Sequence, residues 1–475
     1  MPMIEEVEDD SPMVKQEDEP ELEHLLKQLT IPPEYSRPEY LSENPLPALE
    51  TWKRKTIAVL EDIQRIVKLQ GTRALDTEAR ADVVFAVVPF APVRSGSGLE
   101  RDSTPLREEW VEERAGTLAR GILALPQTSP SLDLVREVLT HNLKPIFKES
   151  PHPNLNTETG RKLGGYAGGP MAMQDYYEEQ VWKEYPGIGK VVLWCVRHIP
   201  EDAYENMWHL IIPPVMTLLD DYEAKHKLQG VYVVQEMLQN VPKDLLKRTG
   251  IAGLVQQSLR TCLSHLQSPE TAELIKNAIA ASLSLILLTT SIGPGSKAPA
   301  ERFDELSSLL GQGIINDIWL YAEDKPGAIH ATFEALPPLL TALDVGSVRF
   351  LKSLMPQLAH SLIPQPLLPA DRDLQISALL VLKTILAVCS PRIPFWKETI
   401  LDAVGRCWVG IQDEERKGSN KLPGDEKLRK DVKEQLQSIC VELARICPSV
   451  IKNEYPRFIK ADKDLFQNLL PQINA

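Results

Sequence analysis

The sequence predicts an all-α protein of 475 residues. Apolar residues recur at helical spacing along most of the chain, and segments that alternate apolar and polar residues are scarce. Apolar residues make up 43% of the chain and charged residues 25%, so the helices have enough apolar surface to build a core. A Pro-Pro motif occurs twice, which indicates that the helices form structural repeats.

The first residues are strongly acidic. Residues 1–21 hold nine of the acidic groups and one lysine, and so carry much of the net charge of −14. Such a segment cannot bury enough apolar surface to offset the entropy lost on ordering, so we expect residues 1–20 to form a disordered acidic tail. The acidic balance disfavours nucleic acid as a partner, and no secretory signal pattern is present.

Helical periodicity begins after the tail, and we expect an N-terminal helical region over 21–147. In LETWKRKTIAVLEDIQRIVKL (49–69), Trp52, Leu60 and Ile63 lie on one stripe with charges opposite. ADVVFAVVPF (81–90) fits either a strand or a buried helix. Further helices are expected at 105–124, 131–147, 176–198, 251–266, 270–290, 301–322, 347–363, 371–390, 394–412 and 427–447.

Two irregular segments interrupt the helices: a Gly-rich loop over 148–175 and a charged loop over 413–427. The rest, 176–475, contains the repeated motif. IIPPVMTLLDD (211–221) and ALPPLLTALDV (335–345) share Pro-Pro-x-x-Thr-x-Leu-Asp, 124 residues apart. This distance is about three HEAT units of roughly 40–47 residues. We therefore predict an α-solenoid of irregular HEAT-like helix pairs over 176–475.

The segment LLDDYEAKHKLQG (218–230) is the main candidate for chemistry. It places Asp220, Asp221, Glu223 and His226 within seven residues, and Glu223 and His226 have the spacing of two metal ligands on a helix. A di-metal bundle needs a second such motif, and the other two matches lie beside the acidic tail (Glu21–His24) or across a proline (Glu149–His152). We favour a turn in which an aspartate caps the next helix and pairs with Lys225 or Lys227.

Other patterns give no catalytic or cofactor site. YPGIGKVV (185–192) resembles a phosphate loop but lacks the first glycine and the Ser or Thr. The apolar run at 277–296 is too short for a membrane span, and the six cysteines are expected to be buried, reduced thiols. We expect no catalytic residue, no metal, no cofactor, no nucleic acid and no membrane.

The middle of the chain resembles the Tti-two family, the smaller Tel-two-interacting subunit of the Triple-T co-chaperone complex. The resemblance runs through TGRKLGG (159–165), VWKEYPGIGKVVLWCVRHIP (181–200), MWHLIIPPVMTLLDDYEAKHKLQG (207–230) and RIPFWKETILDAVGRCWVGI (392–411), covering about 140–450. The family-motif residues are Trp182, Trp194, Trp208, Pro213, Pro214, Asp220, Asp221, Lys227 and Gly230.

The resemblance implies a non-catalytic α-solenoid that binds Tti-one-like and Tel-two-like subunits. With the ninety-kilodalton heat-shock chaperone, these stabilise phosphatidylinositol-3-kinase-related kinases such as TOR and ATM. It also implies a cytoplasmic protein, with the nucleus open as a second location. A HEAT-repeat transport or regulatory adaptor and a helical metalloenzyme are the competing hypotheses.

The C-terminal half, 300–475, is the expected docking region for the Tti-one-like partner. DLFQNLLPQI (464–473) carries an apolar stripe with no charged cap after it, and a solenoid end must be polar or covered. The candidate docking residues are Trp396, Trp408, Phe466 and Leu469.

Overall fold

The computed structural model describes residues 18–36, 46–69, 75–92, 108–149, 151–164, 180–290, 298–322, 324–364, 370–417 and 425–471. Most of the expected acidic tail (1–17), the later part of the Gly-rich loop (165–175) and residues 418–424 of the charged loop lie outside these ranges. The chain forms two compact units, Met1–Thr217 and Leu218–Ala475. The sequence predicted a different division, between an N-terminal helical region (21–147) and helical repeats (176–475), with the 148–175 loop between them.

The all-α prediction is confirmed. Within the described ranges, β-structure is limited to one antiparallel pair, β1 (Leu155–Asn156) and β2 (Arg161–Lys162), in the Gly-rich segment. The ambiguous segment 81–90 is helical, because it forms the end of α4 (Thr77–Val87) and the 3-10 turn η2 (Val88–Phe90). Its valines are buried, and a buried apolar run of this length fits a strand or a helix equally well from the sequence.

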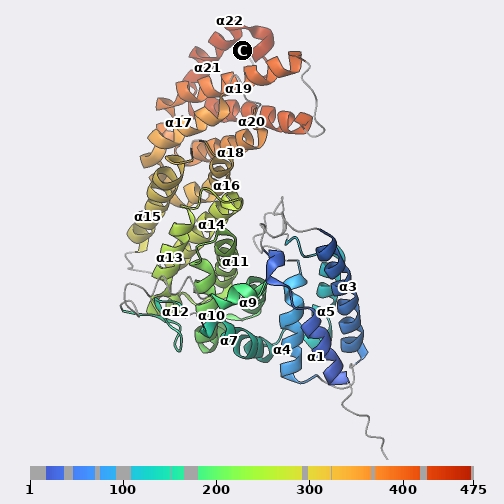
Figure 1. The fold of residues 1–475 in the computed structure, drawn as a ribbon. Helices are drawn as coiled ribbons and strands as arrows, with labels where there is room; N and C mark the ends of the chain where they lie inside the picture. Colours follow the sequence, from blue (N-terminus) through green and yellow to red (C-terminus); the bar gives the residue numbers. More distant parts are fainter. Residues whose placement is uncertain are drawn as a thin grey trace, which may run out of the picture. The chain divides into compact units, whose positions relative to one another are not determined.

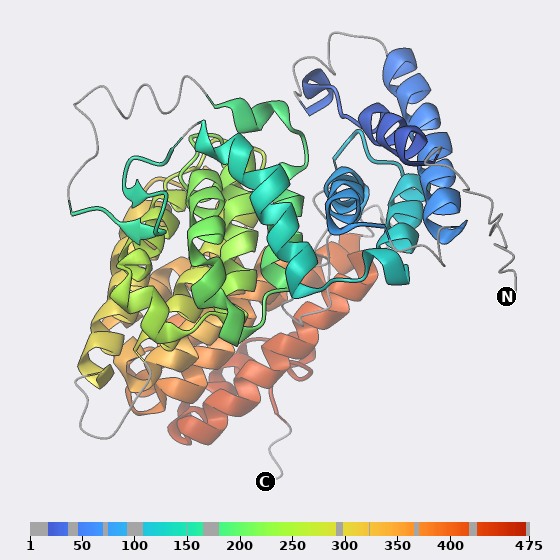
Figure 2. The same cartoon turned by 90° about the horizontal axis from the view of Figure 1, so that it is seen from below.

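The first unit combines the 24-residue helix α3 with shorter helices around an N-terminal core. Its further elements are α1 (Asp18–Gln28), η1 (Pro33–Ser36), α3 (Leu46–Leu69), α5 (Glu113–Leu123), η3 (Pro126–Thr128), α6 (Leu132–Glu137), the π-helical η4 (Val138–Leu143), α7 (Lys144–Lys148), η5 (Val181–Glu184), α9 (Ile188–Arg197), η6 (Glu201–Ala203) and α10 (Tyr204–Leu219). Helix α3 packs against α1 and α5, and Figure 2 shows these blue and cyan helices beside one another. A row of aromatic rings, Tyr35, Trp52, Phe90 and Trp110, joins the core, with successive centroids 5.5 to 6.2 Å apart.

The helix expected over 176–198 begins only at Ile188. Gly187 precedes it with φ 84°, a left-handed conformation that favours glycine, and Pro186 stands before it. A Cβ at Gly187 would lie 2.7 Å from Cβ of Pro89 and 3.3 Å from the Trp110 ring. The start of α9 is therefore set both by the backbone turn and by close packing on the N-terminal core.

The second unit is a longer series of helices. They are α11 (Ala224–Asn240), α12 (Lys243–Arg248), α13 (Ile251–Cys262), α14 (Thr271–Thr289), α15 (Ala298–Ser308), the π-helical η7 (Leu309–Trp319), α16 (Pro326–Leu343), η8 (Asp344–Phe350), α17 (Leu351–Leu362), α18 (Arg372–Val388), η9 (Ser390–Phe395), α19 (Lys397–Lys417), α20 (Asp425–Ile446), α21 (Ser449–Asn453), α22 (Tyr455–Ala461) and α23 (Lys463–Phe466).

These helices form two layers. Helices α11, α14, α16, α18 and α20 contact one another in succession, and α13, α15, α17 and α19 lie along the other side (Figure 1). Polar side chains link neighbours in the first layer: Tyr232 donates to Glu273, and Lys276 pairs with Glu334 at 3.2 Å. The five helices of this layer begin 46 to 55 residues apart, which is an irregular repeat.

The two Pro-Pro motifs occupy equivalent positions in their helices. Pro213–Pro214 lie inside α10 and Pro337–Pro338 inside α16, and each helix ends five residues after its second proline. A proline inside a helix removes one backbone donor. In α16 the Thr341 hydroxyl, which belongs to the shared motif, donates to the Pro337 carbonyl one turn earlier at 2.8 Å. The motif threonine thus bonds to the backbone of its own helix.

Helix α14 has nearly the bounds expected from the sequence, 270–290, and it is the one described helix that is long and apolar enough to cross a membrane. By length and composition, the expectation that this apolar segment is too short for a membrane span is therefore wrong. Length and composition alone are weak evidence, because buried core helices pass the same test. In this fold α14 packs against α11, α13 and α16, and 56% of its apolar window is buried.

Candidate functional site

The acidic segment lies in the turn between α10 and α11. Glu223 is the N-cap residue of α11, with no side-chain cap bond, so the expectation that an aspartate occupies this position is wrong. Instead, fully buried Asp221 accepts the backbone N–H of Glu223 through Oδ1 at 2.8 Å. This is the local bond typical of an aspartate in a turn, and it orients the chain just before the helix starts.

Asp221, Glu223 and His226 bring one ligand atom each to within 4.8 Å of one another. The sequence grouped Asp220 with them, but Asp220 does not belong to this trio. His226 Nε2 lies 3.8 Å from Glu223 Oε2, the distance of an ion pair when the histidine is protonated. Two carboxylates and an imidazole are chemically suited to a divalent cation, whereas structural zinc sites usually have four ligands.

Lys227 has partners other than the expected aspartate. Its side chain is only 4% exposed, and Nζ donates to the carbonyl of Leu219 at 3.1 Å and to Thr261 Oγ1 at 3.3 Å. Leu219 is the last residue of α10, where the helix carbonyls have no partners within the helix. The lysine thus places a positive charge at a helix C-terminus and ties it to α11 and α13.

Gly230 allows the backbones of two helices to approach closely. A Cβ at this position would lie 2.5 Å from both N and Cα of Leu219 and 2.8 Å from the carbonyl carbon of Leu218. These are backbone atoms that cannot rotate away. The Asp-Lys-Gly part of the motif therefore has a structural explanation in the joint between these segments.

The three motif tryptophans have different surroundings. Trp182 is buried and stacks on Phe147, with ring centroids 6.1 Å apart and planes at 15°. Trp208 is buried and lies against Gly160, in the turn between β1 and β2. A Cβ at Gly160 would be 3.0 Å from Trp208 Cδ1. Trp194 is half-buried, and its ring lies 4.7 Å from that of His198. Two separate motif segments, 159–165 and 207–230, thus meet at Gly160 and Trp208.

The phosphate-loop candidate at 185–192 is a packing element. Lys190, the residue that would bind a phosphate, is 4% exposed, and its Nζ donates to the Pro89 carbonyl at 3.0 Å. The same ammonium lies 5.3 Å from the centroid of the Trp110 ring, within range of a cation–π contact. The Lys190 ammonium therefore lies in the N-terminal core.

The cysteine thiols are buried in the part of the chain that the structure describes, where all six are free of disulfides. Burial raises the pKa of Cys262, Cys407 and Cys440 to about 12 and that of Cys389 to about 11. Since the thiolate is the nucleophile, these protonated thiols are poor candidates for covalent catalysis.

The C-terminal apolar stripe is mostly buried, contrary to the expectation from the sequence. Phe466, Leu469 and Leu470 are 2–8% exposed, and Gln437 of α20 donates to the Asn468 carbonyl at 2.6 Å, which holds the final turn against an earlier helix. Trp408 is 2% exposed, and its Nε1 donates to the Leu465 carbonyl at 2.8 Å. Trp396 is half-buried. Trp408 and Leu469 are therefore core residues, and they do not offer an exposed docking surface.

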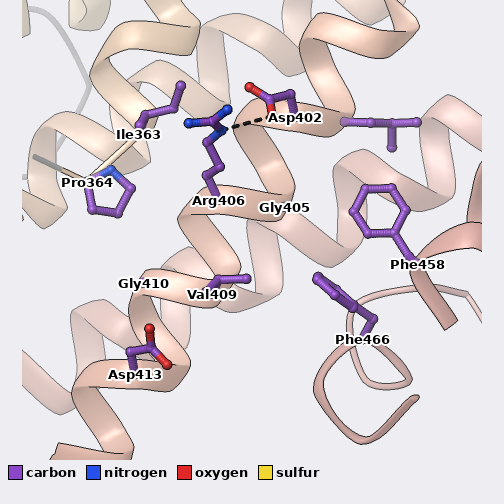
Figure 3. A pocket seen from close by; sticks show the side chains of 11 residues that line it. Ile363, Pro364, Asp402, Gly405, Arg406, Val409, Gly410, Asp413, Phe458 and Phe466 are labelled. Carbon is purple, nitrogen blue, oxygen red and sulfur yellow. Dashed lines mark hydrogen bonds and ion pairs between the residues drawn. The ribbon is translucent and has the colours of Figure 1, made fainter. Parts of the chain in front are cut away.

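An open groove remains beside these residues, and we call it the C-terminal groove. It has a volume of about 470 Å³ and runs between the end of α17, α19 and the α22–α23 segment. Figure 3 shows Phe458 and Phe466 on one side and Pro364 on the other, with Gly405 and Gly410 of α19 between them. The two phenyl rings pack edge to face, 5.0 Å apart.

Charged side chains of α19 border this groove. Arg406 Nε donates to Asp402 Oδ1 at 2.9 Å, and Asp413 stands further along the helix (Figure 3). Gly410 lets α19 lie close to Pro364, because a Cβ at this position would be 2.5 Å from Pro364 Cγ. Apolar walls with a mixed-charge border suit contact with a protein surface.

Residues 103–370 match the Tti2 family, which is more than half of the chain. The chain belongs to the Tti2 family. It is 29% identical over 153 residues to TELO2-interacting protein 2 of Homo sapiens, an alignment that covers 31% of this chain and 29% of the human protein. It is 26% identical over 149 residues to the proteins of the same name from Mus musculus and Rattus norvegicus, covering 31% of this chain and 28% and 29% of theirs.

These alignments span less than a third of each relative's length. The name of each relative describes an interaction with TELO2. No solved structure matches the chain.

The Tti2-family match begins and ends earlier than the resemblance in the sequence suggested. It starts at residue 103, before α5, and stops at 370, so the segment 392–411 on η9 and α19 lies beyond it. The motif residues from Trp182 to Gly230 lie inside the matched range, and the C-terminal groove lies almost wholly outside it.

Sequence inspection missed the most exposed apolar residues of the second unit. Phe395 is 78% exposed directly beside Trp396, and Leu320, Tyr321, Val345 and Val441 are also more than half exposed. Leu320 and Tyr321 lie in the turn after η7, and the other three lie in η9, η8 and α20. No local sequence pattern marks these positions as exposed.

Proposed function

We propose that this Tti2-family protein is a non-catalytic, HEAT-like α-solenoid scaffold in a Triple-T-type co-chaperone complex. In that complex it binds Tel-two-like and Tti-one-like helical-repeat subunits in the cytoplasm, with the nucleus as a second compartment. Together they stabilise newly made phosphatidylinositol-3-kinase-related kinases such as TOR and ATM, with the ninety-kilodalton heat-shock chaperone. The observation that carries the proposal is the family match over residues 103–370.

The arrangement of helices supports a scaffold. Layers of stacked helices present long continuous surfaces and suit binding of extended partners. The similarity to TELO2-interacting protein 2 of Homo sapiens and Mus musculus supports a Tel-two-like protein as one partner. The buried thiols and the inward-facing Lys190 support a role without nucleophilic or nucleotide chemistry.

We place the docking site for the larger Tti-one-like subunit on the C-terminal groove. Its lining includes half-buried Ile363, Pro364, Val409 and Phe458, which a partner helix would cover. Asp402, Arg406 and Asp413 then supply polar contacts at the edge, where solvent remains accessible. This keeps the docking region in the C-terminal half, as the sequence predicted, but moves the contact from the buried apolar stripe to the groove beside it.

The test is co-expression of the full chain with tagged Tel-two-like and Tti-one-like subunits from the same organism. Val409→Arg places a charge in the groove, and we expect it to reduce recovery of the Tti-one-like subunit at least about tenfold, the loss caused by about 1.4 kcal/mol. Val441→Arg is the matched control, because Val441 is 52% exposed on α20 and does not line the groove. Its recovery of the partner should equal that of the unchanged chain.

The outcomes separate the surface from the function. If neither subunit binds the unchanged chain, the Triple-T assignment is wrong, and stoichiometric recovery of transport factors would support the adaptor hypothesis. If both subunits bind and Val409→Arg has no effect, the Triple-T role is supported and the C-terminal groove is not the docking site. In cells, depletion of the protein should lower the amounts of TOR-type kinases without lowering their messenger RNAs.

A further inference from the structure

The first unit contains an open pocket, separate from the C-terminal groove of the second unit, which we call the N-terminal pocket. It has a volume of about 600 Å³, within the range typical of ligand sites. Its wall is mainly apolar, with side chains from α1, the segment before η1, α4 and α9. The principal wall residues are Leu26, Ile31, Phe85, Pro89, Tyr185 and Val191.

This pocket is open to solvent and presents apolar surface at its mouth. Tyr185 is 41% exposed, and Leu26, Pro32 and Phe85 are half-buried. The deeper positions Leu29, Ile188 and Val191 are 1–3% exposed and belong to the core of the first unit. A bulky apolar group could therefore enter without disturbing the packing beneath.

The border of the pocket is negatively charged. Among the described residues that line it, the carboxylates are Glu23, Asp82 and Glu184, and the single cation is Lys27. Lys27 is paired with Glu23 at 2.6 Å, so these two charges offset each other. Asp82 accepts a hydrogen bond from the neutral Asn142 amide at 2.7 Å, so this contact brings no positive charge to the carboxylate. Glu184 is exposed beside Tyr185.

We propose that the N-terminal pocket binds a cationic amphipathic segment of a protein partner, whose apolar side chains enter the pocket and whose Lys or Arg residues face Asp82 and Glu184. The carboxylates come from three separate elements, α1, α4 and η5, so they match charges spaced along a peptide better than a single amine on a small molecule. Anionic lipid headgroups would be repelled by the same border.

This site is distinct from the proposed Triple-T role. Helix α1, η1 and α4 precede residue 103, where the Tti2-family match begins, so more than half of the pocket lining lies outside the matched segment. The first unit would thereby add a recognition site of its own to the helical scaffold. The inference does not require that the Tel-two-like or Tti-one-like subunits bind this chain.

The test uses the full chain and two fluorescein-labelled helix-forming peptides. One carries Leu and Phe on one face and Lys on the other, and its twin has Glu at every Lys position. Fluorescence anisotropy should show the cationic peptide binding at least about tenfold more tightly than its twin, with the difference shrinking as salt shortens the screening length to about 3 Å at 1 M.

Two substitutions locate the binding. Glu184→Lys reverses one border charge on an exposed side chain, and Tyr185→Ala removes apolar surface at the mouth. Each should weaken binding of the cationic peptide at least about fivefold, or about 1 kcal/mol. Glu109→Lys makes the same charge change on an exposed residue of the same unit outside the pocket, and it should change binding less than about twofold.

Equal affinity for both peptides would overturn the proposal, as would an equal loss in Glu109→Lys and Glu184→Lys. Displacement of the peptide by a neutral detergent, together with unchanged peptide affinity in Glu184→Lys, would show a small apolar-ligand site and also overturn it. Circular dichroism of each variant identifies loss of folding. Recovery of the Tel-two-like subunit, measured in parallel, tests the proposed function separately.

Discussion

Gly230 lies directly against the backbone of Leu219, so close that a Cβ would sit 2.5 Å from the Leu219 Cα. The contact joins α11 to the last residue of α10 at the point where the acidic turn reverses the chain. Lys227, one turn earlier on α11, donates to the carbonyl of the same Leu219. One residue thus receives both the closest backbone contact and a buried ammonium, which makes this joint a sensitive point of the second unit.

We predict that Gly230→Ala destabilises the protein although alanine favours helix formation. Overpacking against fixed backbone costs about 1–3 kcal/mol and outweighs the gain of about 1 kcal/mol in helix propensity. The midpoint of thermal unfolding should fall by several degrees, since 1 kcal/mol shifts it by about 2–4 °C in a domain of this size.

Gly253→Ala is the matched control for this prediction. Gly253 lies in α13, and a Cβ there would meet no atom within 4 Å. Its replacement should leave the melting temperature unchanged or raise it slightly, because only helix propensity changes. A rise in both variants would show that α11 can move away from Leu219.

Lys227→Met should lower the free energy of unfolding by about 1–3 kcal/mol, because it leaves the Leu219 carbonyl and Thr261 hydroxyl without this donor and removes a charge at a helix C-terminus. Thr261→Val removes only one of the two contacts and should cost less. Lys352→Met, at an exposed position on α17, should have no measurable effect. Urea unfolding of the three variants gives the comparison, and equal losses for Lys227→Met and Lys352→Met would contradict it.

The trio of Asp221, Glu223 and His226 should hold no metal in the purified protein. It supplies three ligand atoms from a single turn, and Asp220 is not a fourth. Elemental analysis after purification without chelators should give far less than one equivalent of zinc or iron. One equivalent that disappears in His226→Ala would establish a metal site and revive the metalloenzyme hypothesis.

Trp408 should act through stability and not through partner contact. Trp408→Ala removes a large buried side chain and the hydrogen bond to the Leu465 carbonyl, and we expect a loss of about 3–5 kcal/mol with faster proteolysis of α22 and α23. Trp396→Ala, at a half-buried position, should cost much less. A Trp408→Ala protein of unchanged stability that no longer binds the Tti-one-like subunit would instead make Trp408 an interface residue.

The sequence alone determined that the protein is helical and that it is related to the Tti2 family. Helix formation depends on local periodicity, and the periodic segment at 49–69 forms α3 much as expected. The position of the acidic turn could also be predicted from the local sequence, because the apolar stripes on both sides of 220–223 leave no other place for the chain to reverse. The motif around Trp182 to Gly230 was specific enough to indicate the family, and the match over 103–370 includes it.

Tertiary structure alone decided which apolar and charged groups are covered. The stripe at Phe466 and Leu469 has the composition of an exposed docking face, yet segments more than fifty residues earlier bury it, as the bond from Trp408 to Leu465 shows. Lys190 has the local setting of a phosphate ligand, but Pro89, 101 residues away, accepts its hydrogen bond. The N-terminal pocket combines Leu26, Phe85 and Tyr185, which no sequence spacing connects. Burial and pocket formation depend on which distant elements pack together, and a local pattern does not contain that information.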